Sequence, residues 1–333
     1  MQYINPVKPS EAKGIVAQIY SQIKQDFGRI VEPFTLHSPI PQLLAGVWMA
    51  SRESELVGTV PREAKEVIAA CVSKLNRCPY CVDAHSIMLT AKGDKETAQQ
   101  IINERYQNIK NPKTRKIAEW TLATLSPDSQ LINDPPFRAE EAPEIIGTAV
   151  FYHYINPLVT IYLGKTPLPI PFFRTPMRQL ASIIFKKAVN RPKKLGTSLT
   201  LLPKRSLPQD LTWAKSSSNI AGAYARFAAA IKDIEITTVP NATRKTIIQH
   251  INEWNPKKQQ NNFQCLKETA AKMDSPTKAA TMLALLTINE PHRISKDIIN
   301  NFQRYFSQQT QLLAITAWAS FTKATRIGVW LQR

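Results

Sequence analysis

The sequence predicts an all-α protein. Apolar residues recur at intervals of three and four along most of the chain, which is the spacing of a helix buried on one side. No segment alternates polar and apolar residues convincingly, as a half-buried strand would. At 333 residues with 43% apolar content, the chain can bury a sizeable core, and its length favours two domains over one.

This spacing places helices in both halves of the chain. Each predicted helix covers a stretch in which the apolar spacing is maintained. In the first half the helices cover Ser10–Phe27, Pro41–Leu56, Arg62–Leu75, Cys78–Lys92, Lys95–Asn108, Lys113–Leu125 and Ala139–Leu163. In the second half they cover Asn219–Ile234, Ala242–Trp254, Asn261–Met273, Pro276–Thr287, Lys296–Phe306 and Thr310–Leu331.

A proline-rich stretch separates the two halves. The segment from Gly164 to Gln209 contains seven prolines, which break helices, so we interpret it as a connector. One amphipathic helix, Met177–Val189, is predicted inside it. Its pattern fits a helix packed on a core, the commoner case, and also a helix lying in a membrane interface. We therefore divide the chain into 1–164, a connector at 165–210, and 211–333.

The positive charge of the chain is concentrated around this connector. The net charge is +18, and no Asp or Glu occurs between Ile145 and Gln209, where ten Lys and Arg residues occur. Such a basic segment indicates an anionic partner, either a lipid surface or a nucleic acid. A solvated connector is the simpler interpretation, because aromatic residues do not alternate with the charges as they would in a base-stacking surface.

One segment has the length of a membrane span. Ile145–Gly164 is a run of twenty residues without a formal charge. Because His153, Asn156 and Pro157 lie near its middle, we expect a buried helix in a soluble domain and no membrane span. The N-terminal residues also lack the basic-then-apolar order of a secretory signal, so a cytoplasmic location is expected.

The strongest chemical signal is the stretch "NRCPYCVDAH", Asn76–His85. The chain has four cysteines, three of them within eleven positions, which is too few and too clustered for the disulfide framework of a secreted protein. Redox or metal chemistry is the better expectation. A helix starting here would have Cys78 at its N-cap, Pro79 at its first position and Cys81 in its first turn.

This placement favours a reactive thiol. The positive end of the helix and a neighbouring imidazole both stabilise a thiolate, and Cys81 shares a helix face with His85 four residues later. Two cysteines at this spacing also form a disulfide after one is oxidised to sulfenic acid. Glu66, in the preceding helix, would reach this region only if the two helices form a hairpin. Spacing alone favours an exposed Glu66.

These residues resemble a known family. The stretch "REAKEVIAACVSKLNRCPYCVDAHSIMLTAKGD" is similar to the core of the AhpD-like alkylhydroperoxidases within the carboxymuconolactone decarboxylase superfamily, whose signature is a Glu, a CxxC pair and a following His. Glu66, Cys78, Cys81 and His85 fill the four positions. The resemblance is strong over about Gly58–Asp94 and weaker elsewhere, although Phe151–Leu163 resembles the C-terminal apolar helix of the longer family members.

The resemblance implies a thiol peroxidase that reduces hydroperoxides through a CxxC dithiol/disulfide cycle. Cys81 would attack the peroxide, Cys78 would resolve the sulfenic acid, and Glu66 with His85 would move protons. The implied partners are a hydroperoxide substrate and a thiol or dithiol reductant protein, with no cofactor and with assembly into a homo-oligomer. The chain departs from some family members at Tyr80, where they have a histidine, so turnover is expected to be modest.

The two halves also resemble each other. Gly58–Asn76 aligns without gaps on Thr237–Asn255, and both segments contain Thr-Val-Pro before the helix and end in Asn. This indicates a diverged duplication: two AhpD-like helical repeats, the second degenerate. In the same register, the second copy has Lys245, Lys257, Gln260 and Gln264 where the first has Glu66, Cys78, Cys81 and His85.

Two other functions stay open. Cys71, Cys78, Cys81 and His85 have side chains suited to a zinc site, although Cys71 lies in an apolar helix where a buried structural thiol is usual. A non-catalytic helical scaffold is the second alternative, because the chain already contains one unreactive copy. The remaining candidates have no partner at a meaningful spacing and are expected in the core or on the surface: Cys265, His37, His153, His250 and His292.

Overall fold

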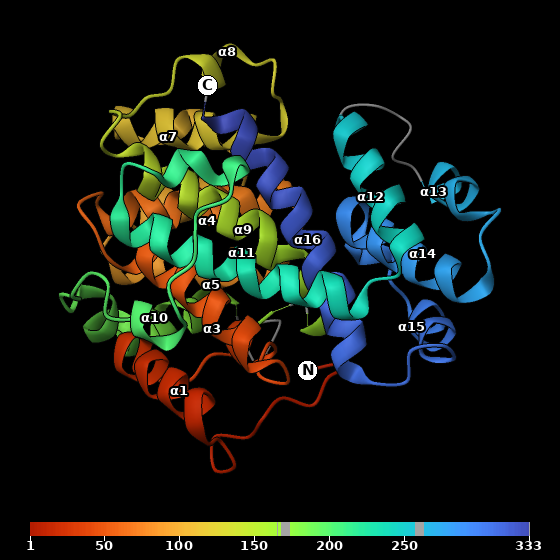
Figure 1. Cartoon of the computed structure of the whole chain (residues 1–333). Coiled ribbons are helices and arrows are strands. Elements are labelled where there is room, and N and C mark those ends of the chain that lie inside the picture. The colour runs from red at the N-terminus through yellow and green to blue at the C-terminus, as the bar shows by residue number, and fades with distance from the viewer. Residues whose placement is uncertain (165, 168–173, 257–262, 333) are drawn as a thin grey trace.

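The computed structural model describes residues 1–164, 166–167, 174–256 and 263–332, and these residues form helices and no strands (Figure 1). The all-α prediction is confirmed. The first half contains α1 (Gly14–Phe27), α2 (Glu32–Thr35), α3 (Pro41–Ser51), the π-helical turn η1 (Arg52–Leu56), α4 (Arg62–Leu75), α5 (Pro79–Ala91), α6 (Lys95–Ile102), η2 (Tyr106–Asn108), α7 (Pro112–Leu122), η3 (Ala123–Leu125), α8 (Gln130–Asn133) and α9 (Ala142–Tyr162).

The connector and the second half contain the remaining elements. These are α10 (Arg174–Asn190), η5 (Leu199–Leu201), η6 (Gln209–Ala214), α11 (Ser218–Thr238), α12 (Asn241–Glu253), α13 (Phe263–Ala270), α14 (Ser275–Asn289), η8 (Pro291–Arg293), α15 (Lys296–Gln303) and α16 (Gln309–Leu331). Most predicted boundaries agree with these helices to within a few residues. The start predicted at Asn261 lies outside the described residues.

Three predicted helices are shorter than expected because their last turns change geometry. The helix predicted to reach Leu56 becomes a π-helical turn at Arg52. The helix predicted over Lys95–Asn108 ends at Ile102, and a separate 3-10 turn follows at Tyr106. The helix predicted to end at Leu125 also finishes in a 3-10 turn. A 3-10 turn is tighter than an α-helical turn and a π-helical turn is wider, yet both keep apolar residues facing the core. Hydrophobic spacing alone therefore does not reveal these changes of geometry.

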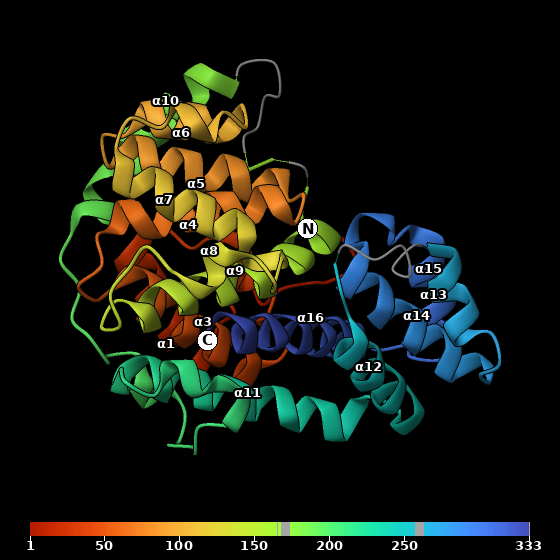
Figure 2. The ribbon, with the colours of Figure 1, turned by 90° about the horizontal axis from the view of Figure 1, so that it is seen from above.

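Two long helices form the centre of the molecule. α9 is buried along most of its length and packs against α16, α4 and η1. Figure 2 shows α16 between α9 and α11, and the group α12–α15 as a lobe at one side. The two halves are joined by hydrogen bonds as well as by apolar contacts: the Tyr162 hydroxyl lies 2.8 Å from the Thr316 hydroxyl, and Ser320 donates to the Tyr154 carbonyl. One hydrophobic core therefore contains residues of both halves.

The polar residues within α9 are all accommodated inside the protein. Asn156 donates to Ser73 and accepts from Asn76, and His153 lies within hydrogen-bond distance of Asn76 and Thr124. The interpretation of this segment as a buried helix is confirmed. In the parts of the chain that the structure describes, no helix combines the length and the apolar character needed to cross a bilayer.

The close approach of α3 and α11 gives a test of this packing. A Cβ atom at Gly46 would lie 2.9 Å from the Cα of Phe227, so the two helices would have to move apart. We expect Gly46→Ala to destabilise the protein, because overpacking costs about 1–3 kcal/mol and the better helix propensity of alanine stabilises by at most about 1 kcal/mol. Urea unfolding measures the difference.

Gly164→Ala is the matched control for this substitution. A Cβ at Gly164 would meet no atom within 4 Å, so its unfolding midpoint should stay close to that of the wild type. A Gly46→Ala protein as stable as the control would contradict the tight α3–α11 contact.

Candidate functional site

The cysteine motif lies at the turn between α4 and α5, which pack against each other as a helical hairpin. Arg77 adopts a left-handed conformation with φ of 53°, which reverses the chain direction within a few residues. The Cys78 amide then donates to the Ser73 carbonyl at 2.9 Å. Cys78 is the N-cap of α5 and Pro79 its first residue, as the sequence predicts.

The two cysteines of the motif are close together but differ in their access to solvent. Their sulfur atoms lie 2.6 Å apart, and both residues are free thiols. Cys78 is completely buried, whereas Cys81 is 4% exposed and borders a cavity whose lining residues do not include Cys78. A small molecule in this cavity therefore meets Cys81 first, and Cys78 lies directly behind it.

The cavity has a volume of about 430 Å³ and is mainly apolar. Polar groups gather at one part of its wall, where Glu55, Arg62, His85 and Tyr152 accompany Cys81. Helix α10 contributes one side of the wall. The apolar lining residues include Phe27, Phe34, Ile87, Met88, Phe151, Ile155, Val159, Leu180, Ala181 and Phe185.

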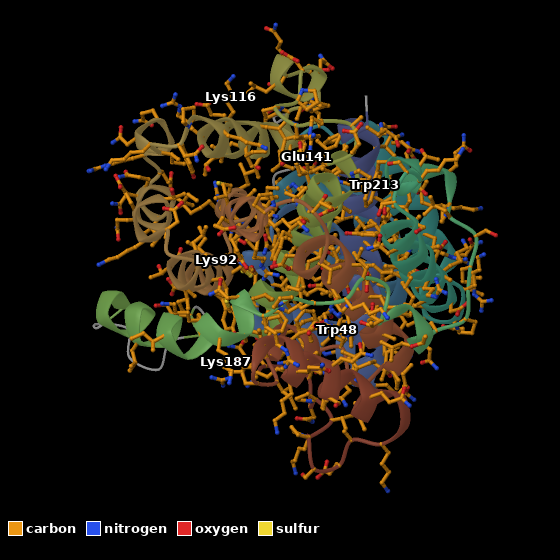
Figure 3. The ribbon with its side chains drawn as sticks, turned by 90° about the vertical axis from the view of Figure 1, so that its left-hand side faces the viewer. Trp48, Lys92, Lys116, Glu141, Lys187 and Trp213 are labelled. Carbon is orange, nitrogen blue, oxygen red and sulfur yellow. The ribbon has the colours of Figure 1, made fainter. Side chains whose placement is uncertain are left out.

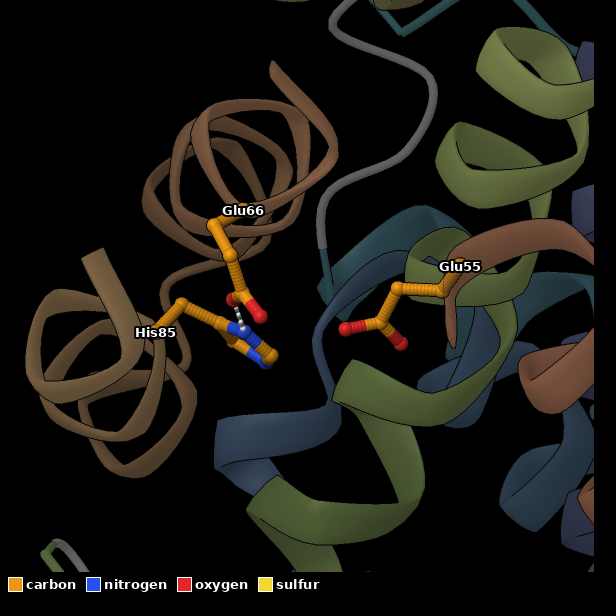
Figure 4. A group of neighbouring side chains, drawn as sticks. All are labelled: Glu55, Glu66 and His85. Carbon is orange, nitrogen blue, oxygen red and sulfur yellow. Dashed lines mark hydrogen bonds and ion pairs between the residues drawn. The ribbon is translucent and has the colours of Figure 1, made fainter. Parts of the chain in front are cut away.

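Glu66 and His85 form a direct pair inside the hairpin (Figure 4). His85 Nδ1 lies 2.7 Å from Glu66 Oε2. The expectation of an exposed Glu66 is wrong: its side chain is completely buried, because α4 turns this face toward α5. Burial disfavours the carboxylate, but the Arg62 guanidinium and the His85 ring lower the pKa of Glu66. The ionised carboxylate accepts the Nδ1 proton of His85, which leaves Nε2 of the ring as a proton acceptor.

Arg62 joins this pair to a second buried carboxylate, Glu55. Its guanidinium lies 2.5 Å from a Glu66 oxygen and 2.8 Å from a Glu55 oxygen. The other Glu55 oxygen accepts from the Tyr152 hydroxyl at 2.8 Å, and the Tyr152 ring packs edge-on against His85 with the centroids 4.6 Å apart. Burial by itself lowers the pKa of Arg62. The charges of Glu66 and Glu55 raise it by more, so the pKa lies above its usual value.

Sequence reasoning missed Glu55 and Arg62. The spacing of Arg62 and Glu66, four apart on one helix, is a signal that was available, because such residues are neighbours on a helix surface. Glu55 had no such signal. It is positioned by the π-helical turn η1, a feature that is rare and is frequent at functional sites.

The environment of Cys81 favours a protonated thiol at rest. Burial and the adjacent Cys78 thiol raise the pKa of Cys81 well above the ordinary value of 9.0, while hydrogen bonds with Asn156 and Ser73 act in the opposite direction. Desolvation has the largest effect on the pKa of Cys81, and it outweighs the stabilisation of a thiolate that the sequence indicates at the helix start. A base that reaches the cavity is needed to ionise Cys81.

The four side chains considered for a zinc site do not form one group, although Cys78 and Cys81 are close to each other. Among the described residues, the side chains that come close enough to share a metal ion are instead those of Glu55, Glu66 and His85. Their potential ligand atoms lie within 4.8 Å of one another. Arg62 already pairs with both of these carboxylates, so they have a cationic partner without a metal ion. Cys71 belongs to the hydrophobic core, and burial raises its pKa.

The other histidines and the remaining cysteine lie away from this cavity. His37 and His153 are completely buried, and His153 is bonded to Asn76 and Thr124, as expected for a core residue. His250 lies beside Asn289, His292 is exposed, and Cys265 is partly exposed. Of the residues aligned with the motif in the second half, Lys245 and Gln264 are exposed, and Lys257 and Gln260 lie outside the described residues.

Tyr80, the residue between the two cysteines, also borders the cavity. Its hydroxyl donates to Glu32 at 3.1 Å, and burial followed by the Glu32 charge raises its pKa. Tyr80 therefore remains protonated at neutral pH and does not act as a proton acceptor there.

Comparison with known proteins gives one informative similarity. No family model matches the chain. Over 332 residues, the chain is 35% identical to the Mycobacterium tuberculosis protein named alkyl hydroperoxide reductase Rv2159c, and the alignment covers 99% of this chain and 95% of that protein. The similarity extends over both halves, so the second half is part of what the two proteins share.

The thiol environment leads to a prediction about Cys81. Because the Cys78 thiol helps to raise the pKa of Cys81, Cys78→Ala should lower that pKa. The rate of Cys81 alkylation by iodoacetamide, measured across pH by mass spectrometry, should rise at a lower pH than in the wild type.

Cys71→Ala is the control, since Cys71 is a buried core thiol that does not line the cavity. In Cys71→Ala, the rate of Cys81 alkylation should depend on pH as it does in the wild type. An unchanged profile in Cys78→Ala would show that the neighbouring thiol does not control the ionisation of Cys81.

Proposed function

The chain belongs to the alkyl hydroperoxide reductase family, and from this premise we propose that it is a thiol-dependent peroxidase with Cys81 as the attacking and Cys78 as the resolving residue. The observation that carries the proposal is the arrangement of the two sulfurs. Cys81 borders the cavity, and Cys78 lies 2.6 Å behind it, out of reach of a molecule in the cavity. The name of the relative favours an enzyme over a non-catalytic scaffold.

In the first step Cys81 loses its proton and attacks the peroxide. His85 accepts the thiol proton, and its pairing with the ionised Glu66 stabilises the resulting imidazolium. The thiolate sulfur bonds to one peroxide oxygen as the O–O bond breaks. The alkoxide that leaves takes the proton from His85, so the products are an alcohol and the sulfenic acid of Cys81.

In the second step Cys78 attacks the sulfenic acid sulfur. The new S–S bond forms, the S–OH bond breaks, and the Cys78 proton leaves with the hydroxyl as water. A dithiol donor then reduces the disulfide by thiol–disulfide exchange and becomes a disulfide itself. Overall, one hydroperoxide and one dithiol give an alcohol, water and a disulfide. The cytoplasm supplies such donors, and we place the reaction there.

We assign a structural role to the second half, residues 211–333. Two of its helices, α11 and α16, pack against α3 and α9, and α9 carries the Tyr152 that contacts His85. The residues of this half that align with the reactive groups are lysines and glutamines, which have no thiol and cannot carry out a dithiol/disulfide cycle. Its contribution is the packing that holds α9 in place.

The roles of the two cysteines lead to opposite outcomes on mutation. With one equivalent of an alkyl hydroperoxide, the wild type should form a Cys78–Cys81 disulfide, and Cys78→Ser should stop at the sulfenic acid of Cys81. Cys81→Ser should leave Cys78 reduced, because Cys78 does not reach the cavity. Mass spectrometry with a sulfenic acid trap distinguishes these products, and trapping at Cys78 in Cys81→Ser would exchange the roles.

Removal of the proton relay should slow the reaction without preventing peroxide entry. We expect Glu66→Gln and His85→Gln each to lower the rate of Cys81 oxidation by about 10²–10⁴, the usual range for general acid–base catalysis. Stopped-flow measurement of sulfenic acid formation gives the rate. Gln264→Ala, in the aligned exposed position of the second half, is the control and should react at the wild-type rate.

A further inference from the structure

Helix α10 lies on the outside of the molecule (Figure 3), and it has exposed apolar side chains. Ile183 is 69% exposed, the largest value among the large apolar side chains that the structure describes, and Leu180 is 60% exposed. The two residues are three apart, and Lys187 is four residues after Ile183, so all three share one side of the helix. An exposed apolar pair on a surface helix indicates an interaction site more strongly than scattered residues do.

The charges along this segment of the chain have a single sign. No Asp or Glu occurs between Ile145 and Gln209. Lys186, Lys187, Arg191 and Lys194 are exposed. Lys92 of α5 donates to Asn190 at the end of α10, although Glu63 also pairs with this lysine. Exposed apolar residues flanked by lysines are the features of a helix that lies in the interface of an anionic membrane.

The same helix forms a wall of the cavity that contains Cys81. Ala181 and Phe185 line this cavity from the inner side of α10, and Leu180 both lines it and is exposed to solvent. An apolar surface is therefore continuous from Ile183 on the outside, through Leu180, into the cavity. A helix with only a packing role would need no such exposed apolar extension.

We propose that the outer face of α10 docks the protein on anionic lipid bilayers, with Ile183 inserted among the acyl chains and Lys186 and Lys187 at the headgroups. The cavity then opens toward the membrane. A consequence that rests on the proposed peroxidase function is that hydroperoxides of lipid acyl chains reach Cys81 from the bilayer along Leu180.

Vesicle sedimentation tests the docking without any chemistry. The full chain with Cys81→Ser is mixed with vesicles of phosphatidylcholine containing phosphatidylglycerol, or of phosphatidylcholine alone. We expect binding to the anionic vesicles that weakens as salt is added. Lys186→Gln with Lys187→Gln should weaken binding roughly 30-fold, from about 1 kcal/mol per lysine, and Ile183→Asp on the order of tenfold.

Matched variants in the second half are the controls. Ile236→Asp changes a residue of α11 that is 61% exposed, and Lys215→Gln with Lys245→Gln removes two exposed positive charges. These variants should bind vesicles within about threefold of the wild type. An equal loss in both sets would mean general attraction by a cationic chain, and it would overturn the proposal.

Two further measurements test whether nucleic acid or a second copy of the chain, instead of a membrane, binds this face. Binding of a DNA or RNA duplex that is tighter than vesicle binding and is lost with the α10 lysines would assign the face to nucleic acid. Loss of a dimer in Ile183→Asp, seen by light scattering, would assign it to a second copy of the chain. Either result would overturn membrane docking.

The reaction with a small soluble hydroperoxide distinguishes this proposal from the proposed function. With Cys81 present, Ile183→Asp should reduce tert-butyl hydroperoxide at the wild-type rate and lose rate only on peroxidised vesicles. Wild-type protein that binds vesicles but reduces no peroxide would refute the peroxidase function alone. Wild-type protein that reduces the soluble peroxide but does not bind vesicles would refute the docking alone.

Discussion

The buried guanidinium of Arg62 is the interaction on which the candidate site depends. It neutralises Glu66 and Glu55, two carboxylates that come from different elements and are almost completely buried. Removing one partner of a buried ion pair typically costs about 3–5 kcal/mol, because the other charge remains without compensation. Arg62 therefore fixes the ionisation of Glu66, and Glu66 fixes the orientation and tautomer of His85 beside the cavity.

This ion network links the reactive hairpin to the rest of the protein. Glu55 lies on the π-helical turn after α3, and Tyr152, which donates to Glu55 and contacts His85, lies on α9. α3 packs against α11, and α9 packs against α16. The position of His85 consequently depends on helices of both halves, although each reactive group itself comes from α4 or α5. This dependence gives the second half a structural role even though the groups of the candidate site come from the first half.

The sequence predicted most helices and the position of Cys78 at a helix start well, and the reason is that both signals are local. Hydrophobic spacing placed α4 at Arg62–Leu75, and the cysteine spacing placed Cys78 at the start of α5. The burial of Glu66, the role of Glu55 and the pKa of Cys81 were not predicted. All three depend on which helices pack together, and a one-dimensional spacing does not contain that information. The contact of Glu55 with Tyr152, for example, joins residues 97 positions apart.

The raised pKa of Cys81 follows from an opposition between two effects at the same helix end. The N-terminus of α5 favours a thiolate by a modest amount, whereas burial in an apolar wall disfavours it by more. The resting thiol is consequently protonated, and a protonated thiol resists unspecific oxidation. Under the proposed mechanism, ionisation is confined to the moment when His85 accepts the proton, with a peroxide in the cavity to receive it on the leaving oxygen. If Cys81 is the nucleophile, as we propose, the same apolar cavity that admits the substrate also keeps this thiol inactive until a substrate is bound.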